Sequence, residues 1–350
     1  MSALARRLET LLDGLLAQGI VGASLALLTA RGEEFALARG LADRFRGTPL
    51  TTDHLFKIAS CTKTFTAAAL LRLVEHGRLS LDEPIARWFP ELPNAARILV
   101  RTLLSHRSGL PEYEHRFDEL SDKRWTPVEL VAFALANETP AEPGGPVRYT
   151  NTGYLLAGLI VEAEGRGPLC ETIRSGFLEP LGLRETWCAS AQDFPRERLA
   201  RGHFHGPDGR GASVDGCQDS TGWFHFSGMG AAGDMVSSPH DLVRWLSALF
   251  EGRVLDARRF SEMACELVPA GFPGTPALAV GHGLWAFAFE NRTLKGHVGQ
   301  LRGHVSVMAH DEASGITAAL CQNSGARDVT SVYMIALHTT LADVFRAAGA

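Results

Sequence analysis

Lysine is scarce in this chain, and the signals of several other functional classes are missing. Only four of the 34 basic residues are lysine, and the others are arginine. The formal net charge of -5 and the lack of a basic stripe exclude a nucleic-acid-binding surface. No run is long and apolar enough to cross a membrane. The motifs H-E-x-x-H and G-x-S-x-G are both absent, which excludes the zincin and α/β-hydrolase classes.

The cysteines and the N-terminus indicate the compartment. The six cysteines lie far apart without a C-x-x-C pair, so we expect free thiols. The first 19 residues place leucines at helical spacing among charged residues, which is typical of an amphipathic helix and not of a signal peptide. We therefore expect a cytoplasmic protein. A length of 350 residues favours two lobes.

A serine followed three positions later by a lysine occurs once, at Ser60 and Lys63. A buried lysine can lose its proton, whereas arginine cannot, so Lys63 stands where a serine nucleophile needs a base. Residues 64–74 are typical of a helix, on which positions i and i+3 share a face. Cys61 would point about 100° away from this pair on a helix. The alternative is a helix-capping serine with a surface lysine one turn later.

Two further motifs lie downstream in a meaningful order. Tyr149-Thr150-Asn151 follows a turn rich in proline and glycine. His297-Val298-Gly299 lies in an alternating apolar segment that is typical of a strand. Acyl transfer needs a nucleophile, a base, a proton relay and a strand edge that offers N–H groups to an oxyanion. The three motifs together supply these parts.

With these motifs the chain resembles the serine β-lactamase and penicillin-recognising superfamily. It is most similar to the branch with Tyr-x-Asn as the second motif and His-x-Gly as the third. That branch includes DD-carboxypeptidases, D-aminopeptidases and D-amino acid amidases, and class C β-lactamases and related esterases are close to it. Residues 102–110, 233–242 and 297–304 are also similar to family segments. The resemblance spans almost the whole chain and implies the β-lactamase-like fold.

The resemblance implies roles for individual residues. Ser60 would attack a carbonyl and become acylated, and either Lys63 or Tyr149 would act as the general base. Asn151 would hold Lys63 and the substrate amide. The backbone N–H groups of Ser60 and Gln300 would form the oxyanion hole.

The third motif bears on the substrate. His297 stands where β-lactamases carry a lysine, and a neutral histidine removes a fixed positive charge from that place. This argues against a β-lactamase, whose substrate carries a carboxylate there. Gly299 would allow a ligand to approach the strand closely.

The apolar patterns predict strands near both ends of the chain and helices between them. We expect strands at 20–29, 35–40, 281–290, 293–298, 305–310 and 316–322. We expect helices at 3–18, 60–77, 99–106, 127–137, 152–164, 169–179, 239–251 and 328–347. The fold class is therefore α/β (α+β), with an antiparallel sheet built from both termini, flanking helices and an all-helical lobe. We expect one catalytic domain, with an α/β lobe (1–58 and 280–350), a mainly helical lobe (59–279) and the active site between them.

Other signals are weaker. Residues 228–233 match G-x-G-x-x-G, but no parallel strand follows promptly, so we expect a tight turn there and no nucleotide. His203 and His205 lack a third metal ligand at a suitable spacing. The glycosylation sequons at Asn137 and Asn291 carry no meaning in a protein that is not secreted. We predict no cofactor and no metal.

The leading hypothesis is a serine hydrolase that acts through an acyl-enzyme on a small amide or peptide, as D-aminopeptidases, D-amino acid amidases and DD-peptidases do. The alternatives are an esterase or acyltransferase with the same Ser-Lys-Tyr site, a β-lactamase, and a non-catalytic binding protein. The expected partner is a small amide, peptide or ester, with no nucleic acid and no membrane. Asp215 or Asp219 is the candidate acid for a substrate amine, and Arg302 is the candidate cation for a substrate carboxylate.

Overall fold

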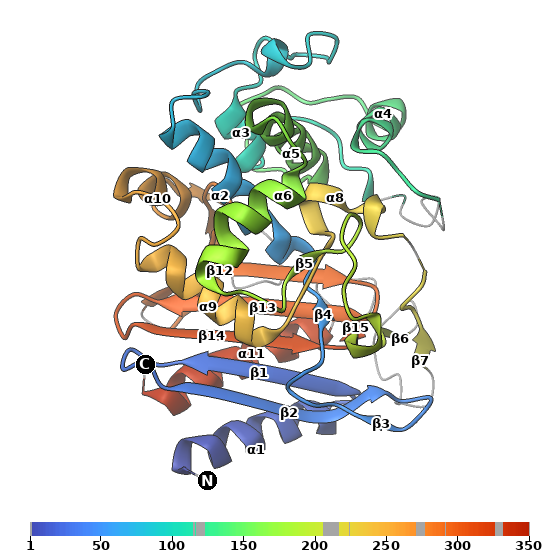
Figure 1. Ribbon diagram of the computed structural model, residues 1–350, viewed down its shortest axis with the longest axis vertical. Coiled ribbons are helices and arrows are strands. Elements are labelled where there is room, and N and C mark those ends of the chain that lie inside the picture. Colours follow the sequence, from blue (N-terminus) through green and yellow to red (C-terminus); the bar gives the residue numbers. More distant parts are fainter. Residues whose placement is uncertain are drawn as a thin grey trace.

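The structure, a computed structural model, describes residues 2–114, 116, 123–205, 217–223, 225–270, 277–290, 292–325 and 332–349. Its centre is a nine-stranded sheet with the strand order β3-β2-β1-β14-β13-β12-β11-β10-β9, in which all neighbours are antiparallel (Figure 1). The N-terminal part of the chain supplies β1 (Gly22–Leu28), β2 (Glu34–Asp43) and β3 (Thr48–Pro49). The C-terminal part supplies β9 (Val268–Pro269), β10 (Ala277–Val280), β11 (Trp285–Phe289), β12 (Arg292–Leu301), β13 (His304–Asp311) and β14 (Ile316–Gln322). The two parts meet where β1 pairs with β14, which confirms the predicted sheet built from both termini.

Helices cover both faces of this sheet. Helices α1 (Ala3–Ala17) and α11 (Val332–Ala348) pack together on one face, as Figure 1 shows. The apolar face of α1 is fully buried there at Leu8, Leu12 and Leu15. Helix α9 (Pro239–Phe250) packs on β1, β13 and β14 from the other side. The alternation of strand side chains separates the two large apolar clusters, one on each face of the sheet, and a small third cluster surrounds Phe194 and Phe226.

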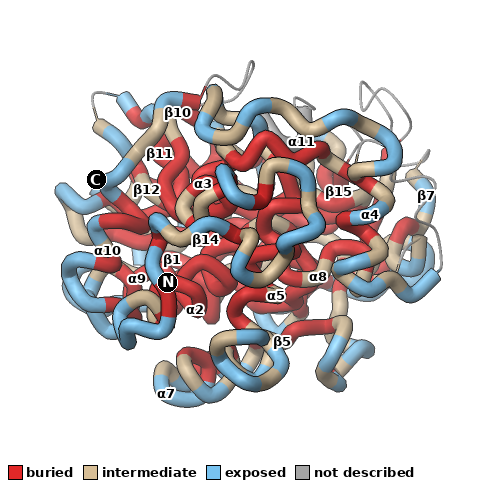
Figure 2. The backbone as a smooth tube through the Cα atoms, turned by 90° about the horizontal axis from the view of Figure 1, so that it is seen from above, coloured by how far each residue is buried: buried red, intermediate tan, exposed pale blue. Residues whose placement is uncertain are grey.

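The rest of the chain forms the helical part above α9 (Figure 1). Its helices are α2 (Thr62–Glu75), α3 (Val100–Leu104), α4 (Pro127–Asn137), α5 (Asn151–Gly165), α6 (Leu169–Ile173), α7 (Glu179–Leu181), α8 (Gly230–Gly233) and α10 (Ala257–Ala264). Figure 2 shows α2 and α5 as the buried interior of this part. Helix α2 is buried along most of its length, and its run of alanines and leucines suits this interior position.

Short strands outside the large sheet were not predicted from the sequence. Two three-stranded sheets occur, with the orders β15-β6-β7 and β4-β8-β5. Their strands are β4 (Phe56–Lys57), β5 (Trp187–Cys188), β6 (His203–His205), β7 (Cys217–Asp219), β8 (Met235–Ser237) and β15 (Ser324–Gly325). Strands of two or three residues are too short to show an alternating pattern, so periodicity does not reveal them.

Several element boundaries differ from the predicted ones. The predicted helix at 99–106 ends at Leu104, because His106 has a left-handed backbone with a φ of 55°. The predicted helix at 169–179 is divided by a π-helical turn at Arg174–Leu178. Helix α10 was not predicted. The large sheet already includes β9 and β10, before the predicted lobe boundary at residue 280.

In the described part of the chain, no helix combines the length and the apolar character needed to span a bilayer. The cytoplasmic location stays a prediction.

Candidate active site

Ser60 lies in a short 3₁₀ helix, Ala59–Cys61, which runs directly into α2. The residue before it, Ala59, has a φ of 48°, a left-handed conformation that costs an alanine about 1–3 kcal/mol. Strain of this kind is common next to reactive residues, because the surrounding fold must hold a side chain in a particular direction. Ser60 is half-buried, whereas the helix behind it is buried along most of its length.

Lys63 is fully buried one turn into α2, on the same face as Ser60. Its Nζ lies 3.0 Å from Ser60 Oγ and donates to Asn151 Oδ1 at 2.6 Å and to the Ala232 carbonyl at 2.8 Å. The predicted pairing of Lys63 with the serine hydroxyl is therefore present in the structure. The Ala232 carbonyl belongs to α8, inside the glycine-rich segment 228–233 that we expected to be a tight turn. That segment forms a short helix, and one of its carbonyls holds the lysine.

Tyr149 reaches the same hydroxyl from the other side. Its Oη donates to Ser60 Oγ at 2.7 Å. The phenol ring lies edge-to-face with Trp285 at a centroid distance of 5.7 Å, and Lys63 Nζ lies 4.9 Å from the ring centroid. Ser60 Oγ is therefore contacted by both residues that the sequence analysis named as candidate bases.

Two glutamates set the orientation of Asn151, which begins α5 and is fully buried. Its Nδ2 donates to Glu114 Oε2 at 2.6 Å and to Glu112 Oε1 at 3.3 Å, and its backbone N–H donates to Glu112. Because carboxylates accept and do not donate, Nδ2 must face the glutamates and Oδ1 must face Lys63. No motif in the sequence pointed to Glu112 or Glu114.

Burial dominates the electrostatics of the site. Desolvation lowers the pKa of Lys63 to about 7, although Glu114 and Glu112 oppose this shift. Desolvation also raises the pKa of the Tyr149 hydroxyl well above its ordinary value, so Tyr149 stays protonated at neutral pH. The pKa of Glu112 is raised by its own burial. The lysine therefore loses its proton far more readily than the tyrosine.

The third motif lies on the edge of β12 next to Ser60. The pairing of β11 with β12 stops where Trp285 lies opposite Gly296, so β11 does not extend along residues 297–301, which pair with β13 on their other side. Strand β12 contacts the 3₁₀ helix that carries Ser60. Ser60 and Gln300 thus lie on adjoining segments, as the predicted oxyanion hole requires.

His297 and Gly299 have structural surroundings that sharpen their predicted roles. Burial lowers the pKa of His297 to about 3, so its imidazole is neutral. Its Nδ1 lies 2.6 Å from the Val298 carbonyl, and its buried Nε2 has no hydrogen-bond partner among the described residues. A side chain on Gly299 would lie 2.0 Å from the Ile58 carbonyl. The chain just before Ser60 therefore requires a glycine here, and the close approach of a ligand to this strand stays a prediction.

Cys61 does not compete with Ser60. Its side chain points into the protein, where Sγ lies 3.5 Å from Ser306 Oγ, and burial raises the pKa of its thiol to about 12. A thiol with such a pKa is not a nucleophile at neutral pH. All six cysteines are free in the structure, as predicted.

The groups predicted to bind substrate charges either lie outside the described residues or contact other side chains of the protein. Asp215 lies outside the described residues, as does Asn291. Asp219 forms an ion pair with Arg201, which also binds Asp43 at 2.9 Å. Arg302 lies over two aromatic rings, 5.9 Å from the centroid of Phe204 and 5.6 Å from that of Trp223. Asp219 and Arg302 thus have a charged and an aromatic environment, respectively, among the described residues.

His203 and His205 lie on β6, where backbone groups hold the His203 ring. The Nδ1 of His203 lies 2.9 Å from the Asn323 carbonyl, and its Nε2 accepts from the Arg44 N–H at 3.2 Å. Within the described ranges, no group of three histidine, cysteine or acidic residues is arranged to hold a metal ion.

Comparison with known proteins agrees with this geometry. Residues 5–339 match the Beta-lactamase family. The structure is similar to that of D-amino acid amidase from Ochrobactrum anthropi SV3, with 46% identity, a TM-score of 0.94, and coverage of 99% of this chain and 98% of that one. It is also similar to a D-stereospecific amidohydrolase from Streptomyces sp., with 28% identity, a TM-score of 0.79, and coverage of 91% and 94%.

Curated relatives include Esterase EstB of Burkholderia gladioli, which is 31% identical over 61% of this chain and 62% of its own length. Penicillin-binding protein 4* of Bacillus subtilis is 29% identical over 61% of this chain and 48% of its own length. The matched region thus spans about half to three fifths of these two proteins. Because the family match covers nearly the whole chain, the protein belongs to the Beta-lactamase family and is a serine hydrolase of that family.

Proposed function

We propose that the protein is an amidase that hydrolyses small D-amino acid amides through an acyl-enzyme on Ser60. The observation that carries this proposal is the convergence of Lys63 Nζ and Tyr149 Oη on Ser60 Oγ, at 3.0 and 2.7 Å. The likeness to D-amino acid amidase, which has been solved with D-phenylalanine and with L-phenylalanine amide, supports the substrate class.

Lys63 is the general base of acylation in this proposal. A neutral amine has two N–H groups and one lone pair, and three oxygens surround Nζ. The carbonyls of Asn151 and Ala232 accept only, so they take the two N–H groups. The lone pair then faces Ser60 Oγ and can take its proton. The pKa of about 7 places enough of the lysine in the neutral form at physiological pH.

Tyr149 is the proton donor to the leaving group. An amide needs a proton on its nitrogen before the C–N bond breaks, because an amide anion is a very poor leaving group. The Tyr149 hydroxyl is protonated and touches Ser60 Oγ, the atom that attacks the carbonyl. It can therefore pass its proton to the departing nitrogen, and the proton that Lys63 took from Ser60 is then available to restore the phenol. The N–H groups of Ser60 and Gln300 would stabilise the oxyanion.

The substrate amine is recognised by the glutamates beside Asn151. Glu114 and Glu112 lie within hydrogen-bond distance of Asn151 Nδ2, so they adjoin the reacting centre. His297 is neutral, so the third motif offers no fixed cation for a substrate carboxylate. This charge arrangement favours a substrate with an ammonium next to the scissile carbonyl, and disfavours a β-lactam or a DD-peptide.

The test is hydrolysis of D- and L-phenylalanine amide, measured by ammonia release, with Ser60→Ala as the blank. We expect turnover of the D-amide and at least tenfold lower kcat/KM for the L-amide. Glu114→Gln should raise KM for the D-amide at least tenfold, whereas for an amide without the amino group it should change only the pH dependence that Lys63 sets. The exposed Glu91→Gln is the matched control. If Glu114→Gln lowered kcat/KM equally for the D-amide and for the amide without an amino group, Glu114 would not bind the substrate ammonium.

An esterase is the second candidate, since Esterase EstB is among the relatives. An ester with a good leaving group needs no proton from Tyr149, so the same site would cleave it. An amidase and an esterase are distinguished by the ratio of kcat/KM for an amide and for an activated ester with the same acyl group. An amidase must also accelerate cleavage of the amide C–N bond, which is the more difficult reaction. A protein that cleaves the ester and leaves the amide intact would be an esterase.

A further inference from the structure

We propose that His106 is a positioning residue for Tyr149, and that it holds the phenol so that its hydroxyl stays on Ser60 Oγ. The inference rests on the proposed function, because it acts through the proton that Tyr149 transfers. His106 is fully buried and has no hydrogen bond with Ser60, so it is not itself a catalytic residue.

His106 makes three contacts with Tyr149 and its two neighbours in the chain. Its ring packs against the Tyr149 ring at a centroid distance of 4.4 Å with an interplanar angle of 31°. Its Nδ1 accepts from the Thr150 N–H at 3.3 Å, and its carbonyl accepts from the Arg148 N–H at 2.8 Å. The residues before and after Tyr149 are thus both bound to His106, while its side chain is held by the ring. Few degrees of freedom remain for the phenol.

The residues after His106 form backbone hydrogen bonds with the turn that leads to Tyr149. The Gly109 carbonyl accepts from the Ala141 N–H at 2.8 Å, and the Arg107 carbonyl accepts from the Gly144 N–H at 2.8 Å. A side chain on Gly109 would lie 2.3 Å from the Ala141 carbonyl, and its φ of 74° is also unfavourable for other residues. These hydrogen bonds attach the turn at 142–146 to the segment 106–109. The segment therefore fixes the position of the backbone that leads to Tyr149.

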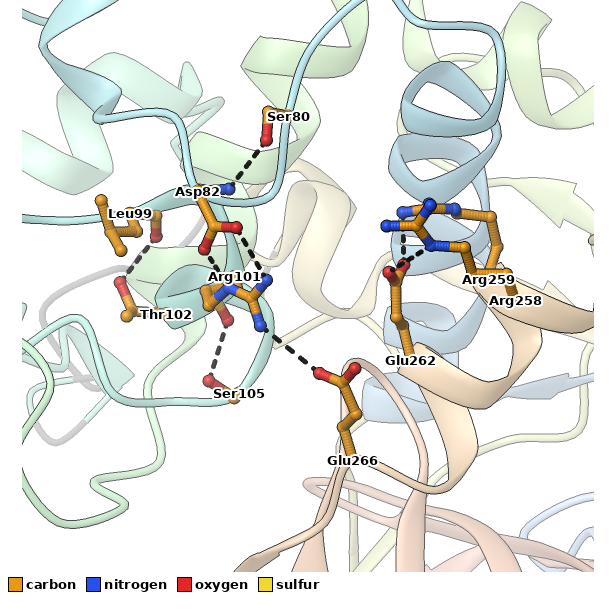
Figure 3. Close-up of polar contacts among 10 residues, drawn as sticks. All are labelled: Ser80, Asp82, Leu99, Arg101, Thr102, Ser105, Arg258, Arg259, Glu262 and Glu266. Carbon is orange, nitrogen blue, oxygen red and sulfur yellow. Dashed lines mark hydrogen bonds and ion pairs between the residues drawn. The ribbon is translucent and has the colours of Figure 1, made fainter.

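The position of His106 is fixed from its N-terminal side as well. Figure 3 shows Arg101 of α3 between Asp82 and Glu266, with two contacts to Asp82 of 2.7 and 3.1 Å and one to Glu266 of 3.4 Å. Ser105 Oγ donates to the Arg101 carbonyl at 2.8 Å and closes the end of the helix (Figure 3). The next residue, His106, then takes its left-handed backbone. A left-handed backbone is unfavourable for histidine, and such strain persists where the surrounding structure holds it.

His106 acts by shape rather than by charge. Because Nδ1 accepts from Thr150, the proton of the neutral ring resides on Nε2. The ring also packs on Tyr154 at 5.2 Å. Burial, Lys63 and His297 all hold the pKa of His106 well below its ordinary value. The imidazole therefore stays neutral over the working pH range and offers a flat face with one acceptor.

The test uses His106→Asn, because asparagine tolerates a left-handed backbone and keeps an acceptor for Thr150 but has no ring. We expect kcat for D-phenylalanine amide to fall 10–100-fold with KM changed less than threefold. The p-nitrophenyl ester of the same acyl group should lose less than threefold, because its leaving group needs no proton. In the Tyr149→Phe background, His106→Asn should change amide hydrolysis less than twofold, since its target is gone.

The exposed His76→Asn is the matched control and should leave both substrates unaffected. Circular dichroism and the melting temperature check the fold of each variant. If His106→Asn does not fold, His106→Gly replaces it, because glycine adopts the same φ without strain. Equal losses for amide and ester, or full losses in the Tyr149→Phe background, would reduce His106 to a structural role. Failure of the proposed function would appear differently, as no amide turnover by the unaltered protein.

Discussion

Replacement of Lys63 by methionine separates the chemistry of the site from its stability. Methionine keeps much of the volume of the side chain but cannot take a proton or donate a hydrogen bond. Removal of a general base costs about 10²–10⁴-fold in rate, and Lys63 also stabilises the developing charge on Ser60. We therefore expect acylation to slow by about 10³-fold or more, which corresponds to about 4 kcal/mol.

The same substitution should have a small and pH-dependent effect on folding. The carbonyls of Asn151 and Ala232 would lose their donor, at a cost of about 1–3 kcal/mol each. Against this, burial lowers the lysine pKa from 10.5 to about 7, so below pH 7 the folded protein carries the full penalty of a buried ammonium, and above pH 10.5 it carries none. Lys63→Met removes that penalty. We compare the free energy of unfolding of the variant with that of the unaltered protein at each pH. This difference should favour the variant by about 2–3 kcal/mol more at pH 6 than at pH 9.

Two assays check this prediction. The burst of p-nitrophenol from an activated D-amino acid ester measures acylation, and urea unfolding at pH 6 and pH 9 measures stability. Lys123→Met is the matched control, because Lys123 is largely exposed and pairs with Glu129 on the surface. An acylation rate within tenfold of the unaltered protein would refute the role of Lys63 as the base. A stability difference that does not change with pH would refute its lowered pKa.

Two other substitutions test the surroundings of the site. Glu112→Gln removes an anion that raises the pKa of Lys63, so the acid limb of the kcat/KM profile should move to lower pH, and an unchanged or higher midpoint would contradict the assigned electrostatics. Gly299→Ala should lower activity at least tenfold and destabilise the protein, because the added methyl group would meet the Ile58 carbonyl at 2.0 Å. In contrast, Gly14→Ala in α1 meets nothing within 4 Å and should stabilise the protein by about 0.5–1 kcal/mol in urea unfolding.

The residues that could be predicted share a local signal. Ser60 and Lys63 lie one helical turn apart, so helix geometry alone brings them together. The strands at both ends have enough length for apolar alternation to be visible, and the predicted sheet follows from them. Tyr149 and Asn151 were reached only because their motif is similar to a family motif, since nothing local connects them with residue 60.

The residues that were missed have no local signal. Glu112 and Glu114 come after a turn with no periodicity, and they reach Asn151 only because α3 and α5 pack together. His106 looked like the end of a helix, and its left-handed backbone shows only in three dimensions. The ion pair of Asp219 with Arg201 likewise has no signal in the sequence, because the two residues lie 18 positions apart in a loop-rich segment. Long-range packing decides each of these cases.

The most direct test of the central claim is peptide mapping by mass spectrometry after incubation with a fluorophosphonate or an activated D-amino acid ester. The account predicts one covalent adduct, on Ser60 in the peptide that contains Lys63, and its complete loss in Ser60→Ala. An adduct that persists in Ser60→Ala, or one that maps to another residue such as Cys61, would contradict the assignment of the nucleophile.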